Sequence, residues 1–154
     1  MSANVIVVVE QEFAHPRPRV FRAWTAPEEM SQWRGSPGWH VERESVTSDL
    51  RTGGRHHHVK VRDDDPSVRV TTDAVFTEYF DPDVFVARQR ITGDSGIDPN
   101  ESLELRVEFT AMGGDSTLVR IVQGPYDPAV AQYHAAGWEK ELARLGTYLE
   151  GGQA

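Results

Sequence analysis

The chain has 154 residues and a mass of 17.3 kDa, a size that fits one domain with one hydrophobic core. Its formal net charge of −8 argues against nucleic acid or an anionic membrane surface as a partner, because such surfaces are bound by clustered Lys and Arg. There is no cysteine, which excludes disulfides, thiolate metal sites and a cysteine nucleophile.

The N-terminal third is predicted to form a strand, two short helices and an edge strand. Residues 4–13 are rich in β-branched side chains, and alternation puts apolar side chains from Val5 to Phe13 on one face and Glu10 and Glu12 on the other, which indicates a strand. The two prolines of His15-Pro16-Arg17-Pro18 end sheet pairing and prepare a helix entry. Residues 40–49 alternate only weakly, as expected for an edge strand. The two short amphipathic helices between these strands are marked by Val20, Phe21, Trp24, Met30 and Trp33.

The middle of the chain is predicted to be a run of antiparallel strands. Alternation in residues 55–61 puts His56, His58 and Lys60 on one face of a strand. Short turns such as Asp81-Pro82-Asp83 join the strands, so neighbouring strands must be antiparallel. The predicted strands cover residues 55–61, 68–80, 84–92, 103–109 and 117–123.

A long helix is predicted to follow the last strand. Asp127 can cap its first turn, Pro128 suits the first helical position, and Gly151-Gly152 stops it. Apolar side chains then recur on one stripe, which is formed by His134, Trp138, Leu142, Leu145 and Leu149. We expect this stripe to pack on the sheet, and a curved sheet around a single helix tends to leave a hollow between them.

Motifs spread along nearly the whole chain resemble one known family. They are Pro16, Val20-Phe21, Ala23-Trp24-Thr25, Pro27-Glu28, Trp33, Gly38-Trp39, the run from Asp49 to Arg55, Glu78 with Asp81-Pro82, and Gly137-Trp138 with Leu142, Leu145 and Leu149. In their order and spacing they resemble the family related to the C-terminal domain of the Hsp90 ATPase activator. That family belongs to the START and birch-pollen-allergen (Bet v 1-like) superfamily. The resemblance spans roughly residues 4–150.

The resemblance implies a fold and a place for a ligand. The fold is α+β, a helix-grip fold with a seven-stranded antiparallel curved sheet around a long C-terminal helix and two short helices after the first strand. It implies one domain over residues 1–154, with a cavity that in many members holds an apolar small molecule or lipid. This chain departs from the family where His56 and His58 follow the glycine pair and where Arg34 replaces a second tryptophan. One cavity wall is therefore expected to be polar.

The histidines are the candidate chemical groups. His56 and His58 are two residues apart on one strand face and could chelate a metal if a third ligand such as His134 or Glu78 faced them. Zinc sites usually present three clearly spaced ligands, so we predict no metal site and no cofactor. His134 lies on the inward stripe, where it would be either a hydrogen-bonded group at the cavity rim or a general acid or base.

Three hypotheses for the function follow. The first is binding of an apolar or aromatic small molecule or lipid between the sheet and the C-terminal helix. The second is a cyclase, dehydratase or hydrolase in which His134 moves protons together with His56 or His58. The third is a co-chaperone-like interaction module with a collapsed cavity. For the first, the predicted ligand contacts are Trp33, Trp39, His56, His58, Tyr79, Gln89, Phe109, Gln123, Tyr126, His134 and Trp138.

The sequence also gives expectations for the cellular location and the oligomeric state. Residues 1–10 lack the basic and long apolar stretches of a signal peptide or membrane anchor, so we expect a cytoplasmic protein without membrane insertion. We expect a monomer or a homodimer.

Overall fold

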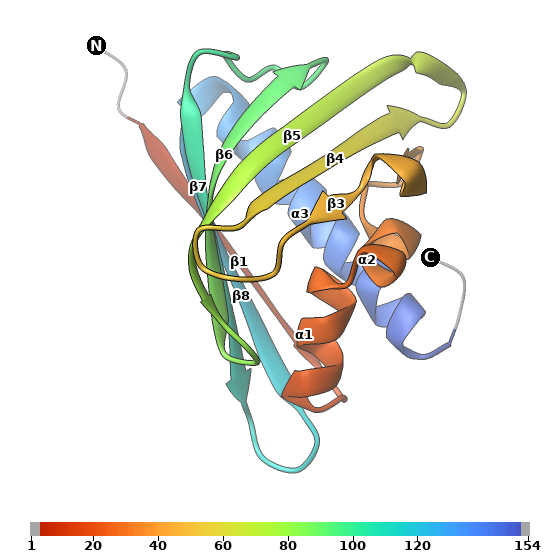
Figure 1. Ribbon diagram of the computed structural model, residues 1–154, viewed down its shortest axis with the longest axis vertical. Helices are drawn as coiled ribbons and strands as arrows, with labels where there is room; N and C mark the ends of the chain where they lie inside the picture. Colours follow the sequence, from red (N-terminus) through yellow and green to blue (C-terminus); the bar gives the residue numbers. More distant parts are fainter. Residues whose placement is uncertain (1–3, 152–154) are drawn as a thin grey trace.

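A curved antiparallel sheet wraps around a long C-terminal helix in the computed structural model, which describes residues 4–151 (Figure 1). Within these residues seven strands follow one another in the order β1-β8-β7-β6-β5-β4-β2, and the short β3 also pairs with β4. The predicted α+β fold, a curved sheet of seven strands around the last helix, is confirmed. The strands are β1 (Val5–Phe13), β2 (Trp39–Val41), β3 (Thr47–Ser48), β4 (Arg55–Arg62), β5 (Asp65–Phe80), β6 (Val84–Gly93), β7 (Ser102–Ala111) and β8 (Thr117–Tyr126), and the helices are α1 (Arg17–Thr25), α2 (Pro27–Trp33) and α3 (Pro128–Leu149).

The helix α3 forms as its sequence predicts. The Asp127 side chain accepts a hydrogen bond from the Ala129 amide at 2.9 Å, and Pro128 follows at the first helical position. The helix ends at Leu149, and Gly151 adopts a φ of 84°, which glycine tolerates without strain. Gly152 lies outside the described residues. The buried stripe of α3 consists of Ala131, Trp138, Glu141, Leu142, Leu145 and Leu149.

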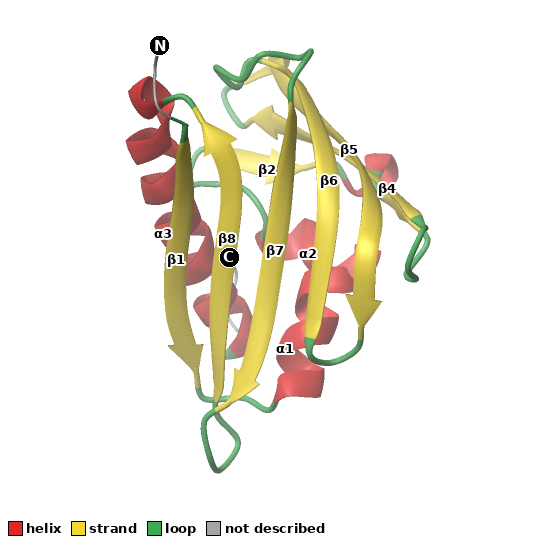
Figure 2. Ribbon diagram, turned by 90° about the vertical axis from the view of Figure 1, so that its left-hand side faces the viewer, coloured by secondary structure: helices red, strands yellow, loops and turns green. Residues whose placement is uncertain are grey.

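The two short helices lie on the same side of the sheet as α3 (Figure 2). Each has a proline in its first turn, and each buries one face in the interior. Phe21 of α1 packs edge-on against Phe109 of β7, with ring centroids 5.0 Å apart. Trp33 of α2 is fully buried, and its indole Nε1 donates to the Ala23 carbonyl at 2.8 Å. No helix within residues 4–151 is long and apolar enough to cross a membrane.

The sequence predicted one continuous edge strand over residues 40–49, and this prediction is wrong. The structure has two short strands there, β2 and β3, separated by a single 3-10 turn (η1, Arg43–Ser45). The Ser45 side chain explains the interruption, since its Oγ accepts a hydrogen bond from the Val59 amide at 2.8 Å. A side chain thus replaces the backbone partner that an unbroken edge strand would offer to β4.

Candidate ligand-binding site

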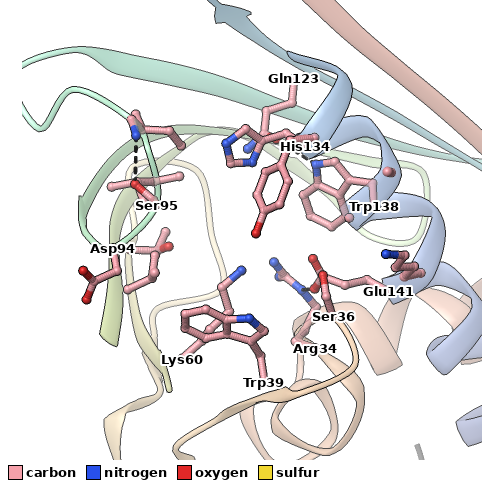
Figure 3. A pocket seen from close by; sticks show the side chains of 18 of the residues that line it. Arg34, Ser36, Trp39, Lys60, Asp94, Ser95, Gln123, His134, Trp138 and Glu141 are labelled. Carbon is pink, nitrogen blue, oxygen red and sulfur yellow. Dashed lines mark hydrogen bonds and ion pairs between the residues drawn. The ribbon is translucent and has the colours of Figure 1, made fainter. Parts of the chain in front are cut away.

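A cavity of about 380 Å³ lies between the concave face of the sheet and α3, and we call it the main cavity (Figure 3). Five strands, α3, the segment after α2 and the loop after β6 line it. The lining side chains come from the segment after α2 (Arg34, Ser36, Pro37), from β2 (Trp39), from β4 (His58, Lys60), from β5 (Val70, Thr72), from β6 and the loop after it (Gln89, Ile91, Asp94, Ser95, Ile97), from β8 (Gln123, Tyr126) and from α3 (Tyr133, His134, Ala136, Gly137, Trp138, Lys140, Glu141).

A hydrogen-bonded polar cluster centred on Gln123 forms one part of the lining. The Gln123 carbonyl oxygen accepts from the Trp138 indole Nε1 at 2.7 Å and from the Tyr126 hydroxyl. Its amide nitrogen donates to the Gln89 carbonyl oxygen at 2.8 Å. All four side chains are buried, and burial raises the pKa of Tyr126, so its hydroxyl stays protonated. The cluster therefore has fixed orientations before any ligand arrives.

A buried ion pair joins α3 to the segment after α2. Glu141 is 5% exposed, and its Oε1 accepts from Arg34 Nε at 3.0 Å and from the Gly35 amide at 2.7 Å. Burial alone would raise the pKa of Glu141, but the positive charges of Arg34 and Lys60 and the Gly35 hydrogen bond outweigh it, and the pKa is lowered. The carboxylate is therefore ionised at neutral pH.

The Arg34 guanidinium of this pair also lies over the indole rings that surround it. Its central carbon is 5.0 Å from the Trp138 ring centroid and 5.5 Å from that of Trp24. Arg34 is thus fixed both by charge and by stacking.

Lys60 of β4 points into the main cavity from the side opposite α3 (Figure 3). Its ammonium nitrogen is 5.8 Å from the Trp39 ring centroid. It forms no ion pair or hydrogen bond with any residue in the range 4–151. Burial lowers the pKa of Lys60, and the charge of Arg34 lowers it further, against the opposing effect of Glu141.

The three candidate histidines do not act as one group. His56 Nε2 lies 2.8 Å from His58 Nδ1, and His56 Nδ1 lies 3.1 Å from Ser48 Oγ. Burial, aided by the charge of Arg34, lowers the pKa of His56 to about 4 and that of His58 well below its usual value. His58 lines the main cavity, whereas His56 lines only a second cavity of about 30 Å³. The two rings form a neutral, mutually bonded pair.

His134 lies apart from that pair, on α3. Its ring stacks on Tyr126, with centroids 4.7 Å apart and an interplanar angle of 15°. Its Nε2 atom is buried without a hydrogen-bond partner among the described side chains and backbone. Burial and the charge of Lys60 lower the pKa of His134, against the opposing effects of a hydrogen bond to the Ser95 backbone and of the Glu141 charge, so the ring is neutral at pH 7.

The structure sorts the predicted ligand contacts into three groups, of which one is His56 alone, which lines only the second cavity. The main cavity is lined by Trp39, His58, Gln89, Gln123, Tyr126, His134 and Trp138. Trp33 and Phe109 lie instead in the buried aromatic core, and the partly buried Tyr79 packs against it; all three are outside the lining of either cavity. Over residues 4–151 no group of three or more metal-ligating side chains is close enough to hold an ion. Glu78, the other possible third ligand, lies on the outer face of the sheet, where its Oε2 is 3.6 Å from Arg106 Nη1.

The charged members of the lining, among them Arg34, Lys60 and Glu141, were not among the ligand contacts predicted from the sequence. Lys60 shares a strand face with His56 and His58, so its inward direction was readable from parity alone. Glu141 follows Trp138 by three residues, which places both on one helix face. Nothing in the sequence pairs Glu141 with Arg34, because 107 positions separate them.

Comparison with known proteins identifies the family. A family model described as "Activator of Hsp90 ATPase homolog 1-like protein" matches residues 14–150. The chain belongs to this family. No curated protein matches the sequence.

Several solved structures share the fold at low sequence identity. A protein from Chromobacterium violaceum is 18% identical with a TM-score of 0.81, and the match covers 94% of this chain and 96% of the other. The AHSA1 protein from Silicibacter pomeroyi is also 18% identical with a TM-score of 0.81, over 95% and 98% of the two chains. DynU16, from the dynemicin biosynthetic locus, is 20% identical with a TM-score of 0.73, over 98% of this chain and 49% of DynU16. At these identities the likeness shows the fold alone.

Proposed function

We propose that the protein binds an apolar or aromatic small molecule or lipid in the main cavity. The observation that carries the proposal is the cavity itself, whose volume of about 380 Å³ falls in the range of small-molecule sites. Val70, Ile91 and Ile97 supply apolar lining, and the indoles of Trp39 and Trp138 add flat apolar surface. The Gln123 cluster adds a few fixed polar groups. Apolar walls with a small number of oriented polar atoms are typical of such sites.

The cavity wall next to α3 is held in place before binding. Arg144 Nη1 of α3 donates to the Gly35 carbonyl at 2.8 Å and to the Trp39 carbonyl at 2.9 Å. Together with the bond from the Gly35 amide to Glu141, these contacts tie the segment before β2 and the first residue of β2 to the helix. Because this wall is already ordered, less conformational entropy is lost when a ligand binds, and this supports ligand binding in the cavity.

A neutral fluorescent probe tests the proposal without assuming a charge on the ligand. We expect N-phenyl-1-naphthylamine to increase its fluorescence on binding to the protein. Thr72→Phe should weaken this binding by about tenfold or more, because Thr72 is buried in the cavity lining and a phenyl ring there takes up ligand volume. Thr71→Phe is the matched control, since Thr71 neighbours Thr72 on β5 but lies outside the lining.

Two results would contradict the proposal. One is the absence of any fluorescence increase with the wild-type protein. The other is equal probe affinity in Thr72→Phe and Thr71→Phe, with both variants folded by circular dichroism, because binding would then lie outside the main cavity.

A further inference from the structure

The charges of the main cavity are not balanced. Its cationic lining side chains are Arg34, Lys60 and Lys140. Arg34 is paired with Glu141, and Lys140 is exposed to solvent. Lys60 is partly buried and has no ion pair within the described chain. One positive charge therefore faces the cavity without a counterion.

Neither carboxylate of the lining compensates Lys60 by direct contact. Glu141 is already engaged, because its Oε1 accepts from both Arg34 and the Gly35 amide. Asp94 is exposed, and its carboxylate is turned away from the cavity centre (Figure 3). An uncompensated ammonium group in a protein interior is costly, and an anion beside it would relieve that cost.

A second polar atom of the lining also lacks a partner. The buried Nε2 of His134 makes no hydrogen bond with the described residues, and in a neutral imidazole the tautomer decides whether this atom donates or accepts. Lys60 is a donor in its charged form, and a ligand acceptor beside it would also be compatible with the His134 tautomer that carries its proton on Nε2. The charged Lys60 thus calls for an acceptor on the ligand, whereas a ligand amine would leave Lys60 unpaired and add a second cation.

The apolar surface lies beside the free cation. The Trp39 ring is 5.8 Å from the Lys60 nitrogen, and Val70 and Ile91 belong to the same lining. From this juxtaposition we propose that the ligand is an amphipathic carboxylate, whose carboxylate pairs with Lys60 while its apolar part lies against Trp39, Val70 and Ile91. This inference rests on the proposed function, and it specifies the class of ligand.

Competition among three ligands of one chain length tests the inference. Decanoate, decanol and decylamine are titrated against bound N-phenyl-1-naphthylamine at neutral pH. For the wild-type protein we expect decanoate to displace the probe at a concentration about tenfold or more below that of decanol, since hydrogen bonds to charged groups exceed neutral ones by that factor. Decylamine should be the weakest of the three.

Three variants test whether the preference for decanoate over decanol depends on Lys60. Lys60→Met should bring decanoate to within about twofold of decanol while the probe still binds, and Lys60→Arg should keep most of the preference. Arg88→Met is the control for net charge, because Arg88 is exposed and lies outside the lining, and its preference should equal that of the wild type.

The outcomes separate the two proposals. Equal displacement by decanoate and decanol, or a preference that persists in Lys60→Met, would overturn the carboxylate inference and leave the apolar cavity in place. Failure of the probe and of all three ligands to bind would overturn the proposed function and the inference together.

Discussion

Removal of the negative charge of Glu141 should destabilise the protein strongly. In Glu141→Gln the side chain keeps its shape and one carbonyl oxygen, so the contacts to Arg34 Nε and the Gly35 amide can still form. What disappears is the charge that balances Arg34, whose side chain is only 12% exposed. Breaking a buried pair by removing one partner typically costs about 3–5 kcal/mol. Because the glutamine retains the two hydrogen bonds, we expect about 2–4 kcal/mol.

Equilibrium unfolding in urea, monitored by tryptophan fluorescence, measures this cost. The same loss should lower the melting temperature by about 5–12 °C for a chain of this length. Glu139→Gln is the matched control, because Glu139 is exposed on the same helix, and it should change the free energy of unfolding by less than about 0.5 kcal/mol.

A double-mutant cycle then isolates the pair from the other contacts of Arg34. Arg34→Met also loses the stacking on Trp24 and Trp138, so its own cost is not that of the ion pair. In the double variant with Glu141→Gln, the two losses should fall short of additivity by about 2 kcal/mol. A Glu141→Gln protein within about 1 kcal/mol of the wild type, or strict additivity, would refute the reasoning.

Two further predictions concern buried polar groups. The lowered pKa of His56 means that the unfolded chain binds more protons than the folded one between pH 6.5 and about 4, so stability should fall as the pH falls through that window. His56→Phe should make this loss smaller by about 3 kcal/mol, because each pKa unit between 6.5 and about 4 corresponds to roughly 1.4 kcal/mol. An unchanged slope of unfolding free energy against pH would count against this prediction. Gln123→Leu leaves the Trp138 indole and the Tyr126 hydroxyl without their acceptor, so it should lower the free energy of unfolding by about 2–4 kcal/mol. If urea unfolding shows that the free energy of unfolding falls by less than about 1 kcal/mol, water has replaced the glutamine as acceptor, and the prediction is wrong.

The sequence was most informative where local periodicity and burial coincide. In β7 the side chains of Leu103, Leu105 and Val107 are buried as their alternation predicts. The helix α3 begins at Pro128 after its Asp127 cap, as its residues indicate. These features depend on neighbours a few positions away, so a single sequence contains the needed information.

Irregular backbone limited what alternation could predict in β5. The register between β5 and β6 shifts between Phe76 and Glu78, and this bulge changes which side chains face inward. Phe76 and Tyr79 therefore meet on the inner face, with ring centroids 5.2 Å apart, although they are an odd number of residues apart. Tyr79 consequently packs against the aromatic core. A prediction from strict alternation cannot anticipate such a shift in register.

The charged part of the candidate site depends on long-range contacts. The pairing of Arg34 with Glu141 requires α3 to cross the segment after α2, a fact of the tertiary structure. The one local hint was that Arg34 stands where the family commonly has tryptophan. Lys60 became a candidate only when the structure showed that its neighbours leave it without a partner.

The most direct test of ligand binding in the main cavity uses the indole N–H signals of the four tryptophans in proton–nitrogen correlation spectra. Trp39 and Trp138 line the main cavity, whereas Trp33 is sealed in the core. On addition of decanoate, we predict that the signals of Trp39 and Trp138 shift and saturate while that of Trp33 stays in place. Unchanged signals for Trp39 and Trp138 at saturating decanoate would contradict binding between the sheet and α3.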